Sequence, residues 1–270
     1  MKVGFIGAGN LGLAIIKGII ASGLVPAANI IAYDPVRARL EEQSRENGFR
    51  AATGNDQVVR ESEIVFLAVR PPQIEPVLQS LAGLINERQT VLVSIATGIS
   101  LEVMARALNN PKAAIVRTLP NLGVEIKEGL VAMCHSDGVE AGRLREVESL
   151  LAPLGRVVPL PQTMLTTFSS LAACSYAFIF MFIEALAKGG VKEGLTKPQA
   201  LEIAAQAVAG AAKLVLETGQ HPYALIDNVC SPGGTTICGV KALEDGAFTA
   251  TVMNAVAAAS ARDLEIIGGK

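Results

Sequence analysis

The amino-acid sequence predicts an α/β protein whose N-terminal part is a doubly wound, mostly parallel sheet and whose C-terminal part is entirely helical. Short apolar runs alternate with helix-like segments in the first 160 residues or so. These runs are apolar without alternation, as expected of parallel strands that helices cover on both faces. Beyond residues 159–162 the strand patterns stop and helical spacing takes over. We therefore expect two domains, residues 1–160 and 161–270.

The composition excludes several classes of partner. With a formal net charge of −2 and no basic run, the chain is not expected to bind nucleic acid. The four cysteines show neither C-x-x-C nor a metal-ligand spacing, so we expect reduced thiols and no metal. The chain begins with a strand pattern and shows no basic region or cleavage site. We therefore expect no signal peptide and a cytoplasmic location.

The first predicted strand, residues 2–6, runs directly into the motif Gly7-Ala8-Gly9-Asn10-Leu11-Gly12 and then into a helical segment. The order strand, G-x-G-x-x-G, helix is typical of a Rossmann-type dinucleotide site. In such a site Gly7 permits the tight turn, Gly9 lets the pyrophosphate approach the backbone, and Gly12 lets the helix pack closely on the strand. The alternative is a glycine-rich turn without a ligand.

The end of the second predicted strand, residues 29–33, bears on the choice of cofactor. Asp34 ends this strand. An acid at this position binds the adenosine ribose hydroxyls and repels a 2′-phosphate, which favours NADH. Arg37 and Arg39 follow closely, and they either reach a phosphate or lie on a solvated helix face. The sequence therefore favours NADH and leaves NADPH open.

The later strands supply further cofactor candidates. A polar helix over residues 35–47 is stopped by Gly48. Strands are predicted over residues 49–52, 64–69, 90–95, 114–118, 130–133 and 157–158. A helix is predicted to follow Pro72 and to end at about residue 84, and two more helices are predicted over residues 100–108 and 139–151. Ligands of doubly wound sheets lie beyond the carboxyl ends of the strands, so the turns at residues 68–71 and 96–98 are expected to line the cofactor. Plain strand ends are the alternative.

The C-terminal half is predicted to contain helices over residues 163–189, 197–218, 222–229, 235–245 and 247–267. The segment over residues 165–187 is long and apolar, and Glu184 is its only charge. A helix that is apolar on every side either spans a membrane or is deeply buried. Because the surrounding sequence is that of a soluble enzyme, we expect this helix to be buried in a protein interface and not in a membrane.

One turn in this half is a candidate ligand site. The run Ser231-Pro232-Gly233-Gly234-Thr235-Thr236 interrupts the helices and leads into the next one. A glycine-rich turn at a helix start presents unpaired backbone N–H groups that suit a carboxylate or a phosphate. The hydroxyls of Ser231, Thr235 and Thr236 would add directed hydrogen bonds. An ordinary capped corner between two helices is the alternative.

These motifs together resemble the pyrroline-5-carboxylate reductases along essentially the whole chain. The matching runs are Gly7–Gly12, Ala68-Val69-Arg70-Pro71, Arg117-Thr118-Leu119-Pro120-Asn121, Phe182-Ile183-Glu184-Ala185-Leu186-Ala187 and Asp227-Asn228-Val229-Cys230-Ser231-Pro232-Gly233-Gly234-Thr235-Thr236-Ile237. The last run is the family signature. The resemblance implies a Rossmann-type domain followed by an all-α dimerisation domain that interlocks with its mate in a homodimer, and larger rings of dimers are compatible with it.

The resemblance also implies the site residues. The cofactor, NAD(P)H, would contact Gly7, Ala8, Gly9, Asn10, Leu11, Asp34, Asn55, Val69, Arg70, Pro71, Ala96, Thr97 and Asn228. The substrate would lie on Ser231, Gly233, Gly234, Thr235 and Thr236, with the amides of residues 233–236 on its carboxylate. Thr236 would be the catalytic residue, orienting the ring nitrogen. The site would form between the nucleotide domain and the helical domain, with elements from the partner subunit.

The implied reaction is the NAD(P)H-dependent reduction of the cyclic imine 1-pyrroline-5-carboxylate to L-proline. Other interpretations are a reductase of a different imino acid, a 3-hydroxyacid-type dehydrogenase and a regulatory protein that keeps the fold. The dehydrogenase needs a base, often a lysine, and nothing marks Lys188 or Lys213 for that role. The chain departs from the family at residues 172–178, where Ala-Ala-Cys-Ser-Tyr-Ala-Phe replaces the usual Ser-Gly-Ser-Gly-Pro-Ala-Tyr. This change either alters the substrate pocket or only affects helix packing.

Overall fold

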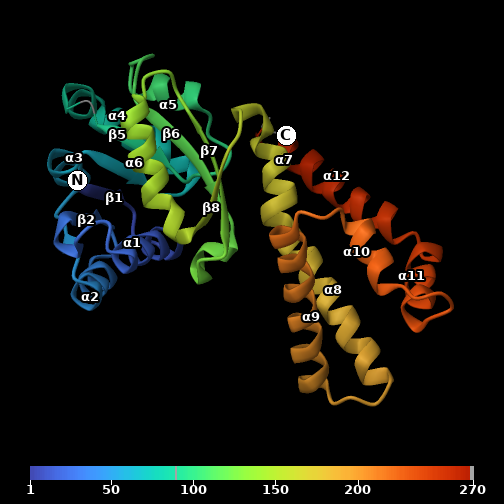
Figure 1. Ribbon diagram of the computed structural model, residues 1–270. Helices are drawn as coiled ribbons and strands as arrows, with labels where there is room; N and C mark the ends of the chain where they lie inside the picture. The colour runs from blue at the N-terminus through green and yellow to red at the C-terminus, as the bar shows by residue number, and fades with distance from the viewer. Residues whose placement is uncertain (89, 268–270) are drawn as a thin grey trace. The chain divides into compact units, whose positions relative to one another are not determined.

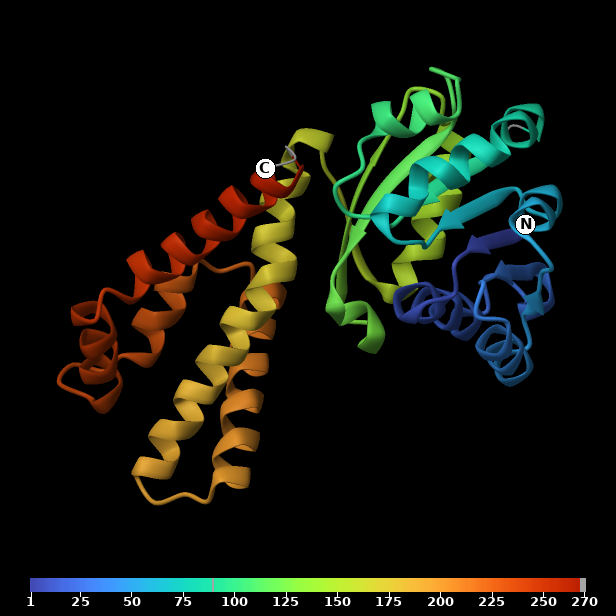
Figure 2. The ribbon, with the colours of Figure 1, turned by 180° about the vertical axis from the view of Figure 1, so that it is seen from behind.

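The computed structural model describes residues 1–88 and 90–267, which form two compact units (Figure 1). One unit comprises Met1–Ala173 together with the chain from Asp263 onward, and the other comprises Cys174–Arg262. Figure 2 shows from behind that strands occur only in the first unit and that the second is built of helices. The division into functional domains at residue 160 stays a prediction.

The first unit is built on one eight-stranded sheet with the strand order β3-β2-β1-β4-β5-β6-β7-β8. Strands β1 to β6 are parallel, β7 is antiparallel to β6, and β8 is parallel to β7. The strands are β1 Val3–Ile6, β2 Ile30–Tyr33, β3 Arg50–Ala51, β4 Ile64–Leu67, β5 Val91–Ser94, β6 Ile115–Pro120, β7 Gly129–His135 and β8 Gly155–Pro159. The predicted doubly wound, mostly parallel sheet is confirmed.

The direction of strand order reverses between β1 and β4, which is where doubly wound sheets bind their ligands. The helices of this unit are α1 Asn10–Ser22, α2 Arg37–Asn47, α3 Asn55–Glu61, α4 Pro71–Arg88, α5 Leu101–Ala107, α6 Ala141–Leu151 and α7 Leu165–Phe168. Short turns of helix are η1 Ala27–Asn29, η2 Leu122–Ile126, η3 Ala152–Leu154, η4 Gln162–Met164 and the π-helical η5 Ser169–Cys174.

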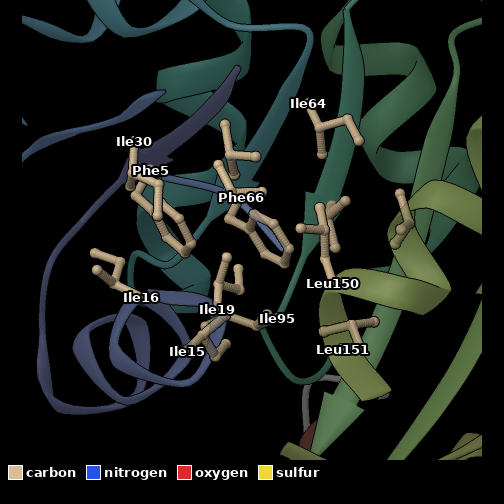
Figure 3. Packing of buried hydrophobic residues seen from close by; sticks show 14 of the residues in the cluster. Phe5, Ile15, Ile16, Ile19, Ile30, Ile64, Phe66, Ile95, Leu150 and Leu151 are labelled. Carbon is tan, nitrogen blue, oxygen red and sulfur yellow. The ribbon is translucent and has the colours of Figure 1, made fainter. Parts of the chain in front are cut away.

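One face of the sheet is covered by α1 and α6. Ile15, Ile16 and Ile19 of α1 are fully buried against alternate strand residues such as Phe5 and Phe66, in a cluster that also holds Leu150 and Leu151 of α6 (Figure 3). The rings of Phe5 and Phe66 stack with their centroids 4.7 Å apart. Because successive strand residues point to opposite faces, these side chains define one layer of the core.

The other face is covered by α3, α4 and α5. Val58 and Val59 of α3 and Ile74 of α4 are fully buried there against Ile6 and Val65. Strand residues are therefore buried on both faces of the sheet, which explains why their sequences are apolar without alternation. Helix α3 was not predicted, because its sequence Asn-Asp-Gln-Val-Val-Arg-Glu is short and mostly polar.

The second unit contains α8 Ser175–Lys192, α9 Lys197–Thr218, α10 Pro222–Val229, α11 Thr235–Asp245 and most of α12 Phe248–Ile267. Helices α8 and α9 form a hairpin whose small buried residues are Ala187, Ala200 and Ala204. An ion pair of 2.6 Å between Lys197 and Glu184 joins the two helices. The predicted helical half is confirmed, and its long first helix is divided by the π-helical turn η5.

Most large apolar side chains of the hairpin remain exposed in the single chain. Met181 of α8 and Leu216 of α9 are each 73% exposed. Among the described residues, Gln162–Lys192 and Lys197–Thr218 are long and apolar enough to cross a membrane by length and composition alone. Helices that are covered by protein pass the same test, so this finding is weak evidence for a membrane span.

Candidate active site

The turn after β1 requires glycine at its first position. Gly7 has φ +97°, in the left-handed region, and its N–H donates to the Tyr33 carbonyl at 2.8 Å. A Cβ on Gly7 would lie 2.5 Å from the Ala68 carbonyl oxygen. The loop therefore passes very close to the end of β4, and no side chain fits between them.

Gly9 occupies a different environment, although it belongs to the same motif. It is the N-cap of α1 with extended backbone, and no described atom lies within 4 Å of a Cβ built on it. The protein itself thus gives no packing reason for glycine at this position. The open space lies at the N-terminus of α1, where backbone N–H groups and the helix dipole favour an anion. The predicted pyrophosphate fits this cradle.

Asp34 uses one carboxylate oxygen to hold the glycine-rich loop and the other to hold the chain that follows β2. One accepts from the Ala8 N–H at 2.9 Å, and the other accepts from the Val36 N–H at 2.9 Å. Each oxygen keeps a further lone pair, so the predicted contact with ribose hydroxyls remains compatible with these bonds. Asp34 therefore shapes the loop as well as lying at the position predicted for the ribose.

The two arginines that left the cofactor choice open lie in different surroundings. Arg39 donates from Nη2 to Asn10 Oδ1 at 2.8 Å, at the start of α1. Arg37 lies 3.7 Å from Glu41 on the exposed face of α2 and donates to the Ala52 carbonyl at 3.4 Å. Arg39 is thus the one held beside the glycine-rich loop.

Asn55 supports the fit of a ligand in the first unit. It begins α3, and its Oδ1 atom is buried without a hydrogen-bond partner among the described residues. An unpaired buried amide oxygen costs free energy unless a donor reaches it. A ribose hydroxyl is a donor of the required kind, so the chemistry of Asn55 fits the predicted cofactor.

The turns after β4 and β5 lie at the same edge of the sheet as the glycine-rich loop. The Ala68 N–H donates to the Ile6 carbonyl at 2.8 Å, and the Ile95 N–H donates to the Leu67 carbonyl at 3.3 Å. These bonds align the ends of β1, β4 and β5. The structure therefore brings Val69, Arg70, Pro71, Ala96 and Thr97 to the carboxyl edge that carries the loop.

The predicted substrate turn lies in the second unit, between α10 and α11. Gly233 has φ +68°, and the Gly234 N–H donates to the Ser231 carbonyl at 3.0 Å. Gly234 is the N-cap of α11, so it has no side chain with which to cap the amides of Thr235 and Thr236. Asn228 is exposed in the last turn of α10. The predicted unpaired N–H groups at a helix start are thus present in the local geometry.

Burial shifts the pKa of two side chains that lie outside the predicted site residues, Arg117 and Cys134. Burial lowers the pKa of the Arg117 guanidinium on β6, which donates to Gln162 Oε1 at 3.4 Å. Burial also raises the pKa of the Cys134 thiol on β7. Among the described residues there is no group of three or more His, Cys, Asp or Glu side chains able to hold a metal ion.

Asn121 is a buried residue whose contacts the sequence did not reveal. Its Nδ2 donates to the Ala172 carbonyl at 2.8 Å, and its Oδ1 accepts from the Leu130 N–H at 2.9 Å. Its place in the run Arg117-Thr118-Leu119-Pro120-Asn121 marked it as notable, but only the folded chain shows that it reaches a residue 51 positions away.

The fold and the cradle at the carboxyl edge define the class of this protein, which is a nicotinamide-dinucleotide-dependent oxidoreductase. Residues 2–98 match the family model described as NADP oxidoreductase, coenzyme F420-dependent. Residues 162–266 match the model described as pyrroline-5-carboxylate reductase dimerisation. The helical part is therefore an oligomerisation domain.

Two relatives of this chain show the family to which it belongs. The chain is 38% identical to the pyrroline-5-carboxylate reductase of Methanosarcina acetivorans, over 98% of this chain and 97% of that one. It is also 38% identical to the enzyme of that name from Escherichia coli, over 94% of each chain. The chain belongs to the pyrroline-5-carboxylate reductase family.

Solved structures agree with this assignment. A pyrroline-5-carboxylate reductase from Coxiella burnetii superposes with a TM-score of 0.93 at 29% identity, covering 98% of this chain and 97% of that one. A pyrroline carboxylate reductase from Plasmodium falciparum, solved with NADP bound, gives a TM-score of 0.85 at 26% identity, covering 99% and 98%. The whole chain therefore has the fold of the family.

Proposed function

We propose that this chain catalyses the NAD(P)H-dependent reduction of 1-pyrroline-5-carboxylate to L-proline. The observation that carries the proposal is the turn over residues 231–236, whose sequence is the family signature and whose backbone leaves the first amides of α11 without a side-chain cap. A small cyclic imino acid with a carboxylate is the kind of ligand that such a turn accepts.

The first unit is proposed to hold the cofactor. Gly7 to Leu11 would bind the pyrophosphate, Asp34 and Asn55 the adenosine ribose, and the turns at residues 69–71 and 96–97 the remainder. Asn228 of the second unit would lie near the nicotinamide. The open space at Gly9 and the unpaired Asn55 oxygen support this assignment. Bound NAD(P)H supplies a hydride for the carbon of the C=N bond.

The second unit is proposed to hold and orient the substrate. The amides of residues 233–236 would bind the carboxylate, and the hydroxyls of Ser231 and Thr235 would add directed bonds. The Thr236 hydroxyl would orient the ring nitrogen by a hydrogen bond. A hydroxyl is a poor acid at neutral pH, so the imine nitrogen takes its proton from solvent and Thr236 acts by orientation.

For the cofactor, we propose that NADH is preferred and that NADPH is also used. Asp34 at the end of β2 disfavours a 2′-phosphate. Arg39, held by Asn10 at 2.8 Å beside the glycine-rich loop, offers that phosphate a cation. Because these two charges act in opposite directions, we expect a modest preference for NADH and not the exclusion of NADPH.

For the assembly, we propose a homodimer with interlocked helical domains that extend from residue 161, and a higher oligomer of dimers is compatible with it. The exposed apolar faces of α8 and α9 support burial by a second copy. Free cysteines in the described chain and a reducing reaction fit a cytoplasmic enzyme without membrane or nucleic-acid partners.

The test is the oxidation of NADH and of NADPH, followed by absorbance, with 1-pyrroline-5-carboxylate as the substrate. Thr236→Val keeps the shape of the side chain and removes its hydroxyl. We expect kcat/KM for the imine to fall by about tenfold or more, since a buried partner loses its hydrogen bond. Thr251→Val, on the exposed side of α12, is the matched control and should behave as the wild type.

Three outcomes decide the proposal. Turnover by the wild type that falls only in Thr236→Val supports both the reaction and the role of Thr236. A wild type that binds NAD(H) but does not oxidise it with this imine would overturn the proposed reaction. An equal loss in both threonine variants would remove Thr236 from the site.

A further inference from the structure

The loop over residues 95–100 joins β5 to α5, and the proposed function assigns Ala96 and Thr97 of this loop to the cofactor. Its start is fixed by the sheet, because the Ile95 N–H donates to the Leu67 carbonyl at 3.3 Å. Beyond Ala96 the loop is exposed at Thr97 and Gly98, and Gly98 has φ +77°. The position of the loop therefore depends on what holds its far end.

The side chain of Gln162 holds that far end. Gln162 begins η4, and its Oε1 accepts from the Leu101 N–H at 2.8 Å across 61 positions of sequence. Leu101 is the first residue of α5, so this N–H has no partner within the helix. Ser100, the N-cap, accepts only from the Val103 N–H, at 3.3 Å. Gln162 thus completes the cap of α5 from a distant part of the first unit.

The contacts of Gln162 fix which way its amide points. Nε2 donates to both carboxylate oxygens of Glu102, each at 3.1 Å, and Oε1 also accepts from Arg117 Nη1 at 3.4 Å. Hydrogen bonds from Ser100, from the backbone of Glu102 and from Gln162 lower the pKa of the Glu102 carboxyl, which keeps it an acceptor at neutral pH. The reversed amide would place donors against the Leu101 N–H and against Arg117.

From these contacts we propose that Gln162 is a positioning residue for the cofactor, because it anchors the loop over residues 95–100. Arg117, which is only 8% exposed on β6, supports Gln162 from behind this loop. All of these residues belong to the first unit. The inference rests on the proposed function only in that Ala96 and Thr97 are assigned to the cofactor.

The proposal predicts a separation between two ligands. The groups assigned to the adenosine and pyrophosphate follow β1, β2 and β3 and do not include this loop. ADP carries the adenosine and both phosphates but neither the nicotinamide nor its ribose. Loosening the loop should therefore weaken NADH and leave ADP unaffected. A residue that only stabilised the first unit would weaken both ligands together.

Gln162→Leu is the most direct test, since it keeps much of the side-chain volume and removes both ends of the amide. We expect the Kd for NADH, measured by cofactor fluorescence, to rise about fivefold or more, the scale of one lost hydrogen bond. The Kd for ADP, measured by calorimetry, should change by less than about twofold, since its contacts share no partner with Gln162. Amide hydrogen exchange of residues 96–100 should be faster than in the wild type.

Gln199→Leu is the matched control. Gln199 Oε1 also accepts a backbone N–H at the start of a helix, that of Thr196 at 3.3 Å, but it lies in the second unit. Its replacement removes a cap of the same kind from α9. Both affinities and the exchange of residues 96–100 should then remain as in the wild type.

A second variant restores the bonds with the two groups exchanged. In the combined Gln162→Glu and Glu102→Gln variant, the carboxylate at position 162 still accepts from Leu101 and Arg117, and the amide at position 102 donates to it. We expect the Kd for NADH to return to within about threefold of the wild type, because each hydrogen bond keeps one donor and one acceptor.

The outcomes are distinguishable. Weaker NADH binding with faster exchange of residues 96–100 in Gln162→Leu, and recovery in the exchanged variant, support the proposal. Unchanged NADH affinity in folded Gln162→Leu, a parallel loss of ADP, or weaker NADH binding without faster exchange overturns it. None of these measurements uses the imine, so a wild type that binds NADH but does not reduce the imine overturns the proposed reaction alone.

Discussion

At the scale of single residues, the glycines of the first loop serve two different purposes. Gly7 is required by the fold, because its φ is +97° and a side chain would meet the Ala68 carbonyl at 2.5 Å. Gly9 has open space in front of it and ordinary extended backbone. Packing thus explains the glycine at position 7, whereas packing gives no reason for the glycine at position 9, where the proposed function places the pyrophosphate.

This difference gives a paired prediction. Gly9→Ala should unfold in urea like the wild type, but its Kd for NADH should rise about tenfold or more, since a methyl group in a filled site costs about 1–3 kcal/mol. Gly7→Ala should lose about 1–3 kcal/mol of stability from its backbone conformation alone, before any clash is counted. Urea titrations and cofactor fluorescence measure the two effects separately.

The pair carries its own control, because both changes add the same methyl group to the same loop. Destabilisation of Gly9→Ala to the level of Gly7→Ala would show that Gly9 is a packing residue. Unchanged affinity for NADH in a stable Gly9→Ala variant would remove the pyrophosphate from this cradle.

Residue-level roles were also where sequence reasoning reached its limit. The motif over residues 7–12 was evident because its chemistry depends on local spacing. Asp34 accepts two hydrogen bonds, from Ala8 and from Val36, and Asn121 donates one to Ala172. These bonds depend on which chain segments meet in space. Periodicity within one element contains no information about such partners.

At the scale of secondary-structure elements, an ion pair between Arg50 and Glu61 links the edge strand β3 to α3. Arg50 donates to Glu61 Oε2 at 2.6 Å, and Gln57 donates to Glu61 Oε1 at 2.8 Å. The hydrogen bond from Arg50, followed by that from Gln57, lowers the pKa of Glu61 below the ordinary value of a glutamate. Both partners are about a third to a half exposed, so solvent screens much of this interaction.

The stability of wild type relative to Glu61→Gln should therefore depend on pH. A carboxyl with a lowered folded-state pKa contributes stability above its unfolded pKa of about 4.5 and loses it as pH falls through the folded value. We expect a difference of about 0.2–1 kcal/mol at pH 7 that disappears in acid. Urea titrations at several pH values would measure it.

Glu42→Gln, at an exposed position on α2, is the control and should show no comparable trend with pH. A difference between wild type and Glu61→Gln that stays constant from neutral pH down to the acid limit of the folded state would show that the ionic bond to Arg50 does not contribute.

Elements were predicted well wherever the core imposes a period. The buried strands and the long helices of the C-terminal half appear at nearly the predicted residues, because each has a continuous apolar face. The unpredicted features are those that tertiary contacts impose on weak local signals. Helix α3 is short and polar, and the π-helical turn at Ser169–Cys174 has a sequence compatible with an ordinary α-helix. The direction of β7 likewise follows from its pairing and not from its composition.

At the scale of the whole molecule, the helical unit exposes more apolar surface than an isolated protein keeps in water. Its hairpin buries only small residues such as Ala187 and Ala200, while Met181 and Leu216 remain 73% exposed. Burial by a second copy would remove this surface from water at about 25 cal/mol for each Å². Oligomerisation would therefore add to the stability of this unit.

The corresponding prediction concerns the oligomeric state. The wild type should elute as a dimer or a multiple of one in size-exclusion chromatography with light scattering. Met181→Glu and Leu216→Glu should shift it toward the monomer, because a charge at a buried interface costs several kcal/mol. Ile126→Glu, equally exposed at 73% but located in the first unit, is the control and should leave the oligomer intact.

A monomeric wild type would contradict this prediction, and so would dissociation by Ile126→Glu alone. Co-sedimentation of the wild type with lipid vesicles would instead indicate that the apolar helices meet a membrane.

The contact between Gly18 of α1 and Leu154 of η3 has a consequence for synthesis. Leu154 is fully buried and occupies the space where a side chain of Gly18 would lie. The first helix of the protein is therefore completed by a residue made more than a hundred positions later. At about 5–20 residues per second, a ribosome adds Leu154 roughly 7–27 s after it adds Gly18. During that interval the part of α1 that Leu154 covers in the folded protein has no cover from this segment, so the nascent chain exposes apolar surface that favours aggregation or binding by a chaperone.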